Sequence, residues 1–249
     1  NYFLSFKADK KITFGLGTGA DYMAEDIKAD TSGVSFSVRG ESYRLGIMGI
    51  FNVYNAMPAV IVGYEAGLSA EAIRKGLADL KLIPGRVELM DEGQGFTVIV
   101  DYAHEKESMK VLLEMALAMK PTSAKIIVLL GAEGGGRDKA KRPIMGELSA
   151  RMANIVIVSN VDPYEDDPKP ILEDIATAAE RAGKVRGQNL LVIEDRREGI
   201  SKALSLAQTG DVVLITGKGA EQSITIGGVA SLWDDRVVVR EEMKKILGK

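Results

Sequence analysis

The sequence predicts a doubly wound α/β domain over residues 85–249. Its apolar segments are short, rich in Val, Ile and Leu, and lack alternating polar residues, which is typical of parallel strands buried on both faces. Amphipathic helix candidates separate these segments, as expected for a mostly parallel sheet covered by helices on both sides. The strand candidates are 96–100, 126–130, 155–158, 190–193 and 212–215, and the helix candidates are 105–120, 141–152, 170–182, 198–207 and 241–247.

Residues 1–83 predict a smaller α/β region. Arg39-Gly40-Glu41-Ser42 is a turn-like break between two strand candidates, and Ser69 is a suitable N-cap for a helix. Leu82-Ile83-Pro84-Gly85 ends the helical pattern, so we place a domain boundary after residue 83. The strand candidates are 11–15, 34–38 and 43–47, and the helix candidates are 52–65 and 69–80.

The composition excludes several classes of protein. The 249 residues include 32 Lys plus Arg and 35 Asp plus Glu, a formal net charge of −3, which argues against nucleic acid or an anionic membrane as the main partner. No apolar run reaches the roughly 18–20 residues of a membrane-spanning helix. The absence of Cys excludes disulfides and Cys-built zinc sites, and the single His, His104, excludes multi-His metal sites. We therefore predict a soluble, cytoplasmic, globular protein.

Polar, charged or glycine-rich residues follow all five predicted strands of residues 85–249. Ligands bind at the carboxyl ends of the strands in this fold class. The sequence therefore predicts a ligand-binding rim that consists of Asp101 to His104, Gly131 to Lys139, Ser159 to Tyr164, Glu194 to Arg197 and Gly217 to Gln222.

Several rim residues have two interpretations on pattern alone. The Gly134-Gly135-Gly136 loop could present N–H groups to an anion or form a flexible turn. Asp101 could contact a ribose or a metal-bound water, or cap the following turn, and His104 could be a base, a ligand contact or a structural residue. No P-loop is present, because no Gly stands five residues before a Gly-Lys-Ser/Thr. Trp233-Asp234-Asp235 predicts a surface turn without a role.

Seven segments, in order along nearly the whole chain, resemble the Mur ligases, the ATP-dependent enzymes that add amino acids to peptidoglycan precursors. The GGGRDKAKRP and GKGxE segments are typical of the branch that adds the third residue, diaminopimelate or lysine, to UDP-N-acetylmuramoyl-L-alanyl-D-glutamate. The seven segments are Phe51 to Ala56, Pro84 to Glu88, Val100 to His104, Gly134 to Pro143, Asp167-Pro168, Asp195-Arg196 and Gly217 to Glu221.

The resemblance implies three domains: one for the UDP-sugar, a central α/β ATPase domain and a doubly wound (Rossmann-like) C-terminal domain that brings the amino acid. Residues 1–83 would be the C-terminal part of the central domain, and residues 84–249 the amino-acid-binding domain. The chain begins at Asn1 without an initiator Met, and the family's phosphate loop, magnesium-binding carboxylate and carbamylated lysine would lie upstream. We therefore expect no catalytic residue and no metal ligand in this segment, which should be inactive alone; the full-length ligase would use ATP and Mg²⁺ and form ADP.

The resemblance also implies roles for individual residues. Arg137 would bind the carboxylate of the incoming amino acid, a role that suits a forked guanidinium, and Gly217 and Glu221 would hold the far end of its side chain, with Glu221 pairing an ammonium. Lys139, Lys141 and Arg142 match the family, with solvated loop charges as the alternative. The expected nucleotide contacts are Asn52 and Asn55 at the adenine, and Arg86, Asp101 and His104 at the ribose or phosphates.

Departures from the family pattern concern the substrate. Diaminopimelate-adding enzymes have Asp-Asn-Pro-Arg where this chain has Val161-Asp162-Pro163-Tyr164, so the resemblance places Asp162 and Tyr164 at the amino-acid site. The neutral phenol of Tyr164 cannot replace the arginine that binds the second carboxylate of diaminopimelate, so a lysine-like amino acid is favoured. Three further positions differ from the family pattern: Ala220 stands where His is usual, Gly136 where Asp is common, and Glu105-Lys106 where Thr-Pro is usual. These changes leave room for a paralogue that acts on another acceptor.

The expected partners are therefore a UDP-N-acetylmuramoyl-dipeptide and a free amino acid, with neither nucleic acid nor membrane, and we expect a monomer. One alternative is a related ligase of the folylpolyglutamate or poly-amino-acid synthetase type, against which GGGRDKAKRP argues. Another is a non-catalytic binding module that retains the rim.

Overall fold

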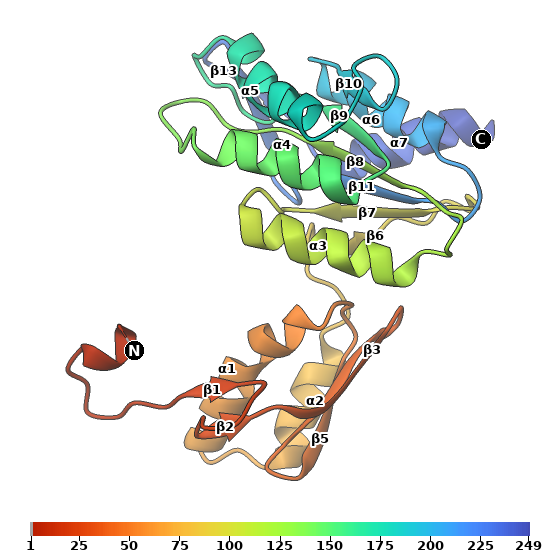
Figure 1. Ribbon diagram of the computed structural model, residues 1–249. Helices are drawn as coiled ribbons and strands as arrows, with labels where there is room; N and C mark the ends of the chain where they lie inside the picture. Colours follow the sequence, from red (N-terminus) through yellow and green to blue (C-terminus); the bar gives the residue numbers. More distant parts are fainter. Residues whose placement is uncertain (1) are drawn as a thin grey trace. The chain divides into compact units, whose positions relative to one another are not determined.

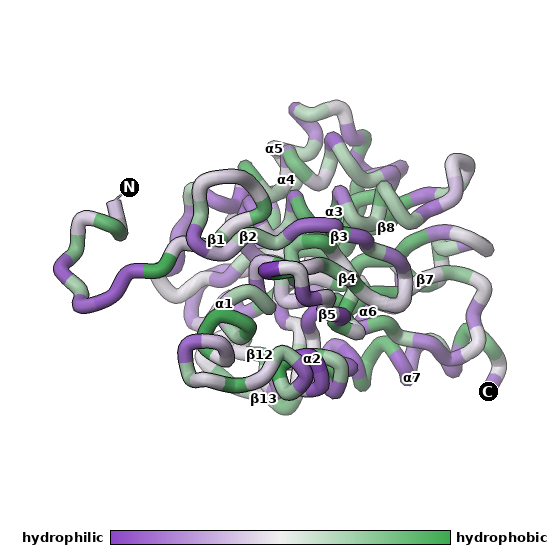
Figure 2. The backbone as a smooth tube through the Cα atoms, turned by 90° about the horizontal axis from the view of Figure 1, so that it is seen from below, coloured by the Kyte–Doolittle hydropathy of each residue, from purple (hydrophilic) through white to green (hydrophobic). Residues whose placement is uncertain are grey.

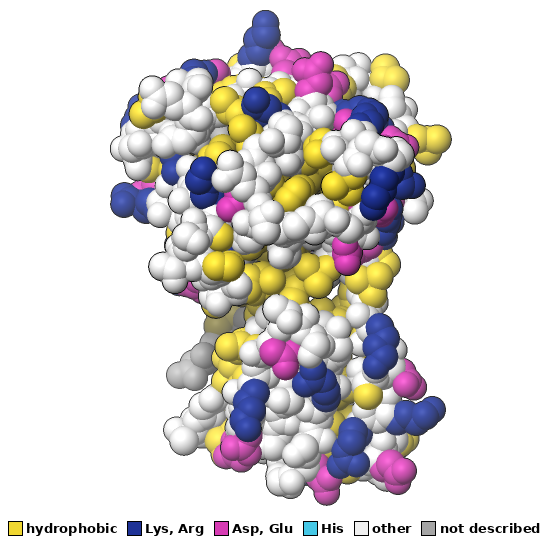
Figure 3. Space-filling model, turned by 90° about the vertical axis from the view of Figure 1, so that its right-hand side faces the viewer, with side chains coloured by type: hydrophobic (Ala, Val, Ile, Leu, Met, Phe, Trp, Pro, Cys, Tyr) yellow, Lys and Arg dark blue, Asp and Glu magenta, His cyan; other side chains and the backbone are white. Residues whose placement is uncertain are grey.

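The computed structural model describes residues 2–249, and the chain divides into two compact units (Figure 1). The first unit ends at Ile83, and the second spans Pro84–Lys249. No helix within the described residues is both long enough and apolar enough for a bilayer crossing. On the face shown in Figure 3, basic and acidic side chains are interspersed.

The first unit is built from a three-stranded antiparallel sheet, a short parallel pair of strands and two α-helices. The sheet order is β3-β4-β5, and Arg39 and Gly40 both have positive φ at the turn between β4 and β5, as a two-residue hairpin turn requires. Its core includes Phe36 and Tyr43 from the sheet and Met57 from α1. The elements are η1 (Phe3–Ser5), β1 (Phe14–Gly15), β2 (Tyr22–Met23), β3 (Glu25–Asp30), β4 (Gly33–Val38), β5 (Glu41–Leu45), α1 (Phe51–Glu65) and α2 (Ala70–Asp79).

The second unit is a six-stranded sheet of order β10-β9-β8-β11-β7-β6 with helices on both faces. Only the edge strand β6 is antiparallel to its neighbour. The prediction of a doubly wound, mostly parallel α/β sheet is thus confirmed. The elements are β6 (Glu88–Leu89), β7 (Thr97–Asp101), α3 (Lys106–Met119), β8 (Ile126–Leu130), α4 (Lys141–Met152), β9 (Ile155–Val158), α5 (Pro168–Arg181), β10 (Leu190–Val192), α6 (Arg196–Leu206), β11 (Val212–Thr216), β12 (Ser223–Ile226), β13 (Val229–Leu232) and α7 (Asp235–Leu247).

The strand sequences are apolar throughout because both faces of the sheet are covered, as the apolar stretches of β7 and β8 show in Figure 2. Successive side chains point to opposite faces: Ile127 and Leu129 pack toward α6 and α7, so Ile126, Val128 and Leu130 point toward the face of α3, α4 and α5. The helices of each face also contact one another.

The last helix differs from the prediction, because α7 begins at Asp235 rather than at residue 241. The Val237-Val238-Val239 run has low helix propensity. Burial of Val238, Val239 and Met243 against the sheet outweighs that propensity, and the Asp234 side chain accepts a hydrogen bond from the Arg236 N–H at the start of the helix. β6 and the β12–β13 hairpin were also not predicted from the sequence.

Candidate functional site

The site is built around β11, which lies between β7 and β8 although it is the last strand of the parallel set. The chain leaves β7, β8 and β9 toward one face of the sheet, where α3, α4 and α5 lie, and leaves β10 and β11 toward the other. In doubly wound folds, ligands bind where adjacent connections diverge in this way. The loops after β7, β8, β9 and β11 therefore meet where a ligand site is expected.

Glycines allow the segment before β6 to pack on the loop after β11. A Cβ on Gly85 would lie 2.1 Å from the Ala220 nitrogen, and a Cβ on Gly219 would lie 2.7 Å from the Gly85 oxygen. Gly217 has φ 107, and a Cβ there would lie 3.0 Å from Val161. This close packing fixes the backbone on which Gly217 and Glu221 stand.

Lys218 is completely buried in this loop and bonds two carboxylates. Its Nζ lies 2.5 Å from Asp162 Oδ2 and 2.8 Å from Glu221 Oε2. Asp162 Oδ1 accepts the Thr225 N–H at 2.7 Å. Two of the predicted amino-acid contacts, Asp162 and Glu221, are thus brought together by an internal ammonium.

Tyr102 stands beside Glu221. Burial raises the pKa of the Tyr102 phenol, and the charge of Glu221 and its hydrogen bond to the phenol raise it further. Tyr102 therefore remains a neutral hydrogen-bond donor at this edge.

Arg137 and Tyr164 form a second pair. The Arg137 guanidinium carbon lies 5.0 Å from the centre of the Tyr164 ring, and its Nη2 lies 3.5 Å from the phenol oxygen. Tyr164 has φ 56 and donates its N–H to the Thr225 oxygen at 3.1 Å. Arg137 Nη1 also donates to the Gly135 oxygen at 3.3 Å. Since Arg137 is exposed and forms no ion pair among the described residues, its remaining N–H groups are available to a carboxylate.

The glycine loop is a turn in which the amides of Gly134 and Gly135 are already engaged. Gly134 N–H donates to the Asp162 oxygen at 2.8 Å, and Gly135 N–H donates to Asp166 Oδ2 at 3.0 Å. A Cβ on Gly135 would lie 2.8 Å from the Tyr164 ring. Of the two interpretations of this loop, the structure favours a turn that supports Tyr164 over a cradle for an anion.

Lys141 and Arg142 are buried rather than solvated, so the interpretation as solvated loop charges was wrong for these two residues. Lys141 Nζ lies 2.8 Å from Glu105 Oε1 and 3.0 Å from Glu133 Oε2. Burial alone would raise the pKa of Glu133, but the hydrogen bond and charge of Lys141 outweigh it and lower that pKa. Arg142 bonds Asp174 and the Glu133 oxygen, whereas Lys139 is exposed.

Asp101, Arg86 and His104 lie together at the carboxyl end of β7. Both Asp101 oxygens accept backbone N–H groups at 2.7 Å, from Val87 and from Ala103. Burial raises the Asp101 pKa, and these hydrogen bonds oppose the shift. The Arg86 guanidinium carbon lies 4.2 Å from the centre of the Tyr102 ring, and His104 Nδ1 lies 2.8 Å from the Tyr102 oxygen. Asp101 thus holds the turn from which Arg86 and His104 project.

Asn52 and Asn55 belong to the first unit, in the first turns of α1. Asn52 is buried and donates Nδ2 to the Met48 oxygen at 2.6 Å. Asn55 is exposed and donates Nδ2 to Asn52 Oδ1 at 2.9 Å. The Asn55 amide oxygen is therefore free to accept a hydrogen bond from a ligand.

Arg196, Asp235 and Trp233 form a buried network that the sequence does not predict. Arg196 forms two bonds to Asp235, at 2.8 and 2.6 Å, and donates to the main-chain oxygens of Asn160 and Thr216. Trp233 Nε1 donates to Asp235 at 2.8 Å, and Asp235 is 0% exposed. The prediction of a surface turn at 233–235 was therefore wrong. The sequence Asp195-Arg196-Arg197 does not indicate which of the two arginines is buried.

Within residues 2–249, no group of three or more His, Cys, Asp or Glu is arranged to hold a metal ion. Asp162, Glu221 and Glu133 take part in bonds to internal lysines instead.

Comparison with known proteins identifies the chain. Residues 85–219 match the Mur ligase glutamate ligase domain, and residues 2–63 match the Mur ligase middle domain. The chain is 37% identical over 249 residues to a UDP-N-acetylmuramoyl-L-alanyl-D-glutamate–2,6-diaminopimelate ligase of Geobacillus kaustophilus, covering 98% of the chain and 49% of that protein. It is 35% identical over 241 residues to a UDP-N-acetylmuramyl-tripeptide synthetase of Roseiflexus sp., covering 95% and 47%.

A solved structure gives the same result. The structure of a UDP-N-acetylmuramoyl-L-alanyl-D-glutamate–2,6-diaminopimelate ligase superposes with a TM-score of 0.61 at 29% identity, covering 95% of this chain and 48% of that one. The chain thus spans about half the length of the curated relatives it matches. With both domain models and the fold in agreement, the chain belongs to the Mur ligase family.

Proposed function

We propose that the protein containing this chain is an ATP-dependent, ADP-forming ligase that adds the third amino acid to UDP-N-acetylmuramoyl-L-alanyl-D-glutamate in peptidoglycan precursor synthesis. Residues 1–83 would be the end of its central ATPase domain, and residues 84–249 the domain that binds the amino acid. The names of the relatives and the matched domain models support this proposal. We expect the reaction to be cytoplasmic and the protein to be a monomer.

The observation that carries the proposal is the pairing of Arg137 with Tyr164 beside the Lys218 cluster, which consists of Lys218, Asp162 and Glu221. Thr225 connects the two, because its N–H donates to Asp162 and its oxygen accepts from Tyr164. One end of this arrangement offers an exposed guanidinium without an ion-pair partner among the described residues to an α-carboxylate, and the other end offers carboxylates. An amino acid with a basic side chain is the complementary ligand.

We propose a lysine-like amino acid rather than diaminopimelate. Tyr164 is neutral and cannot form a charged, forked contact to a distal carboxylate. The Lys218 cluster carries two carboxylates, Asp162 and Glu221, against one ammonium, so its net charge is negative. Such a site favours a cation over a second carboxylate.

The proposed nucleotide-binding residues are Asn52, Asn55, Arg86, Asp101 and His104. Asn55 has an amide oxygen available for the adenine amino group, and Arg86 carries the charge that suits a phosphate. Asp101 orients the turn that holds Arg86 and His104. Mg²⁺ would neutralise charge on the ATP phosphates. Its protein ligands are expected outside this chain.

In the proposed reaction, the D-glutamate carboxylate takes the γ-phosphoryl group of ATP and ADP leaves. The amine of the incoming amino acid then attacks the acyl phosphate, and the amide forms as inorganic phosphate and a proton are released. The residues of this chain contribute binding and orientation rather than covalent chemistry. Arg137 holds the α-carboxylate, and the Lys218 cluster keeps the loops after β9 and β11 in place. The single imidazole, His104, donates its Nδ1–H to the main-chain oxygen of Tyr102 and is not needed as a nucleophile.

ATP-dependent phosphate release by the full-length protein with UDP-N-acetylmuramoyl-L-alanyl-D-glutamate and a panel of amino acids tests the proposal. Release with lysine but not diaminopimelate is the expected result. Release with diaminopimelate alone would keep the reaction class and reject the specificity. Release with neither would favour a paralogue of the folylpolyglutamate or poly-amino-acid synthetase type, or a non-catalytic binding module.

Arg137→Ala is expected to raise the KM for the amino acid by about tenfold or more, because a charged hydrogen bond of roughly 1.5–3 kcal/mol is lost, with little change in the KM for ATP. Arg151→Ala, an exposed arginine paired with Glu147 on α4, is the matched control. Equal weakening of amino acid and ATP would reject the role of Arg137.

A further inference from the structure

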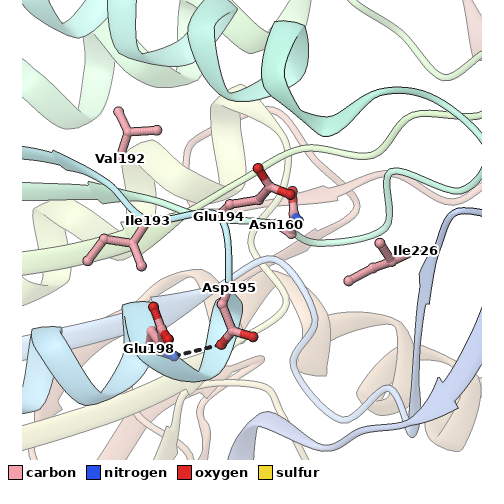
Figure 4. A pocket seen from close by; sticks show the side chains of 7 residues that line it. All are labelled: Asn160, Val192, Ile193, Glu194, Asp195, Glu198 and Ile226. Carbon is pink, nitrogen blue, oxygen red and sulfur yellow. Dashed lines mark hydrogen bonds between the residues drawn. The ribbon is translucent and has the colours of Figure 1, made fainter.

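Two features at the carboxyl ends of the strands are not accounted for by the proposed substrate contacts. One is a hollow of about 600 Å³ at the ends of β9 and β10, which Glu194, Asp195 and Glu198 help to line (Figure 4). Asp195 Oδ1 accepts the Glu198 N–H there, and negative charge stabilises the start of a helix, so α6 accounts for these acidic residues without a ligand. The other feature is the turn at residues 84–88, whose backbone is unusual.

Val87 has a backbone conformation that is rare for its residue type. Its φ is 49°, in the left-handed region that glycine adopts readily and that a β-branched residue almost never adopts. The side chain is 6% exposed. Strained residues of this kind persist where the surrounding structure holds them, and they cluster at functional sites.

Hydrogen bonds hold the backbone on both sides of Arg86. After it, the Val87 N–H donates to Asp101 Oδ2 at 2.7 Å. Before it, Gly85 has φ 64° and donates its N–H to Glu88 Oε2 at 2.8 Å. Arg86 therefore lies between two positions of positive φ that are both fixed.

The Arg86 side chain itself has few contacts. It is exposed, its guanidinium carbon lies 4.2 Å from the centre of the Tyr102 ring, and it forms no ion pair among the described residues. One cation–π contact at an exposed site is weak, so the direction of this side chain depends on the backbone that carries it. A glycine at position 87 would avoid the strain but would leave that backbone free to move.

We infer that Val87 is a positioning residue, whose strained backbone, held by Asp101, orients the Arg86 guanidinium over the Tyr102 ring toward an anionic ligand. Such preorganisation avoids the cost of ordering a long side chain when the ligand binds. That this ligand is a phosphate group of ATP rests on the proposed function.

Val87→Gly and Val87→Ala together test the strain, because both remove the buried methyl groups and only glycine also removes the Cβ. Val87→Gly should unfold at a thermal midpoint about 2–4 °C above that of Val87→Ala. The same two substitutions at Val237, an exposed position in α7, should give the reverse order, since glycine is less favourable than alanine in a helix. A Val87→Gly chain that is unfolded, or that melts at or below Val87→Ala, would overturn the proposal.

Ring-current shifts in the NMR spectrum of the 249-residue chain report the direction of Arg86. Its side-chain protons should resonate upfield because of the Tyr102 ring, and Val87→Ala should keep this shift whereas Val87→Gly should lose most of it. Arg39, whose guanidinium carbon lies 3.8 Å from the centre of the Tyr22 ring, is the internal control and should keep its shift in both variants. A full Arg86 shift in Val87→Gly would reject the positioning role.

Kinetics of the full-length protein separate positioning from stability. Val87→Gly should raise the KM for ATP about threefold to tenfold relative to Val87→Ala, the expected cost of ordering one long side chain on binding, with kcat and the KM for the amino acid unchanged. A merely structural role predicts that the more stable variant binds ATP at least as well. Equal KM values for ATP in the two variants would therefore contradict the inference.

The melting and NMR measurements need no catalysis, so they distinguish this inference from the proposed function. If no amino acid is ligated while Val87→Gly is the more stable variant and loses the Arg86 shift, the proposed function fails and Val87 still positions Arg86. If ligation proceeds and Val87→Gly keeps the parental Arg86 shift, the positioning role fails and the function stands.

Discussion

Arg196 organises the sheet edge through a single buried side chain. It joins the ends of β9 and β11 to the start of α7, through the oxygens of Asn160 and Thr216 and the carboxylate of Asp235. Thr216 directly precedes Gly217, and Asn160 precedes Asp162 by two residues. Arg196 is therefore a positioning residue for the loops that carry the proposed substrate contacts.

Arg196→Met is expected to lower the free energy of unfolding by about 3–5 kcal/mol, because it leaves Asp235 charged and buried without its partner. Arg197→Met is the matched control, since Arg197 is partly exposed and its ion pairs with Glu241 and Glu242 should contribute about 0–1 kcal/mol. Urea denaturation measures both. Similar losses in the two variants would contradict this account.

Glu133 should make stability sensitive to acid. Its pKa in the folded chain is below the ordinary value of 4.5, so its contribution is complete above about pH 4.5 and is lost as the pH falls through the lowered pKa. The Glu133→Gln variant should therefore lose less stability between pH 7 and pH 3.5 than the parent does. Thermal unfolding at the two pH values measures this difference, with Glu114→Gln as the control for one carboxylate fewer. If Glu133→Gln lost as much stability as the parent between pH 7 and pH 3.5, Glu133 would not be the source of the acid sensitivity.

Individual contacts were predictable only where the residue type limits the chemistry. An arginine in a glycine-rich loop after a strand was a sound candidate for a free guanidinium, and Arg137 is exposed. The burial of Lys141, Arg142 and Lys218 was not predictable, because it depends in part on Glu105, Asp174 and Asp162, which are distant from them in sequence. The same limit applies to Trp233 and Asp235.

At the scale of elements, the helix pair α4–α5 depends on one glycine. A Cβ on Gly146 would lie 2.2 Å from the Ile175 oxygen. Backbone approach this close is possible only without a side chain, although Gly in a helix costs about 1 kcal/mol relative to Ala. Packing rather than helix propensity therefore accounts for this residue.

Gly146→Ala is expected to destabilise the chain by about 1–3 kcal/mol through overpacking. Gly76→Ala in α2 should have the opposite sign and stabilise by about 0.5–1 kcal/mol, because no heavy atom lies within 4 Å of a Cβ at that position. Denaturant unfolding of the two variants compares the signs directly. A neutral or stabilising Gly146→Ala would show that the helices can separate without cost.

The bounds of an element could be predicted from the sequence wherever the hydrophobic pattern and the turn or capping residues agree. β8, α4 and β9 have the predicted bounds, 126–130, 141–152 and 155–158. The β12–β13 hairpin was missed because its strands are mostly exposed and lack an apolar run. β6 has only two residues and is defined by pairing with β7, which no local pattern reveals.

At the scale of the whole molecule, each of the two units has its own buried core. In the first unit the core consists of residues between Tyr22 and Leu77. In the second unit the sheet packs against α6 and α7 on one face, and side chains such as Leu113 and Ile126 are buried on the other. No core residue of one cluster belongs to the other. The two units should therefore respond separately to core substitutions.

Met57→Ala should cost the first unit about 2–5 kcal/mol, because Met57 is 0% exposed in its core. Hydrogen exchange should accelerate in β4, β5 and α1 and stay at the parental rate in β8 and β11. Ile127→Ala, at a 0% exposed position of β8, should give the reverse pattern. Faster exchange in both units from either variant would show that they unfold as one.

The bond from Trp233 to Asp235 also has an optical consequence. The chain contains one tryptophan, and its indole N–H donates to the carboxylate that Arg196 holds. When excitation is selective for tryptophan, the fluorescence of the protein thus originates from one indole, which lies next to Arg196 at the carboxyl ends of β9 and β11. Emission from that indole offers an intrinsic signal for ligand binding there, with no label attached.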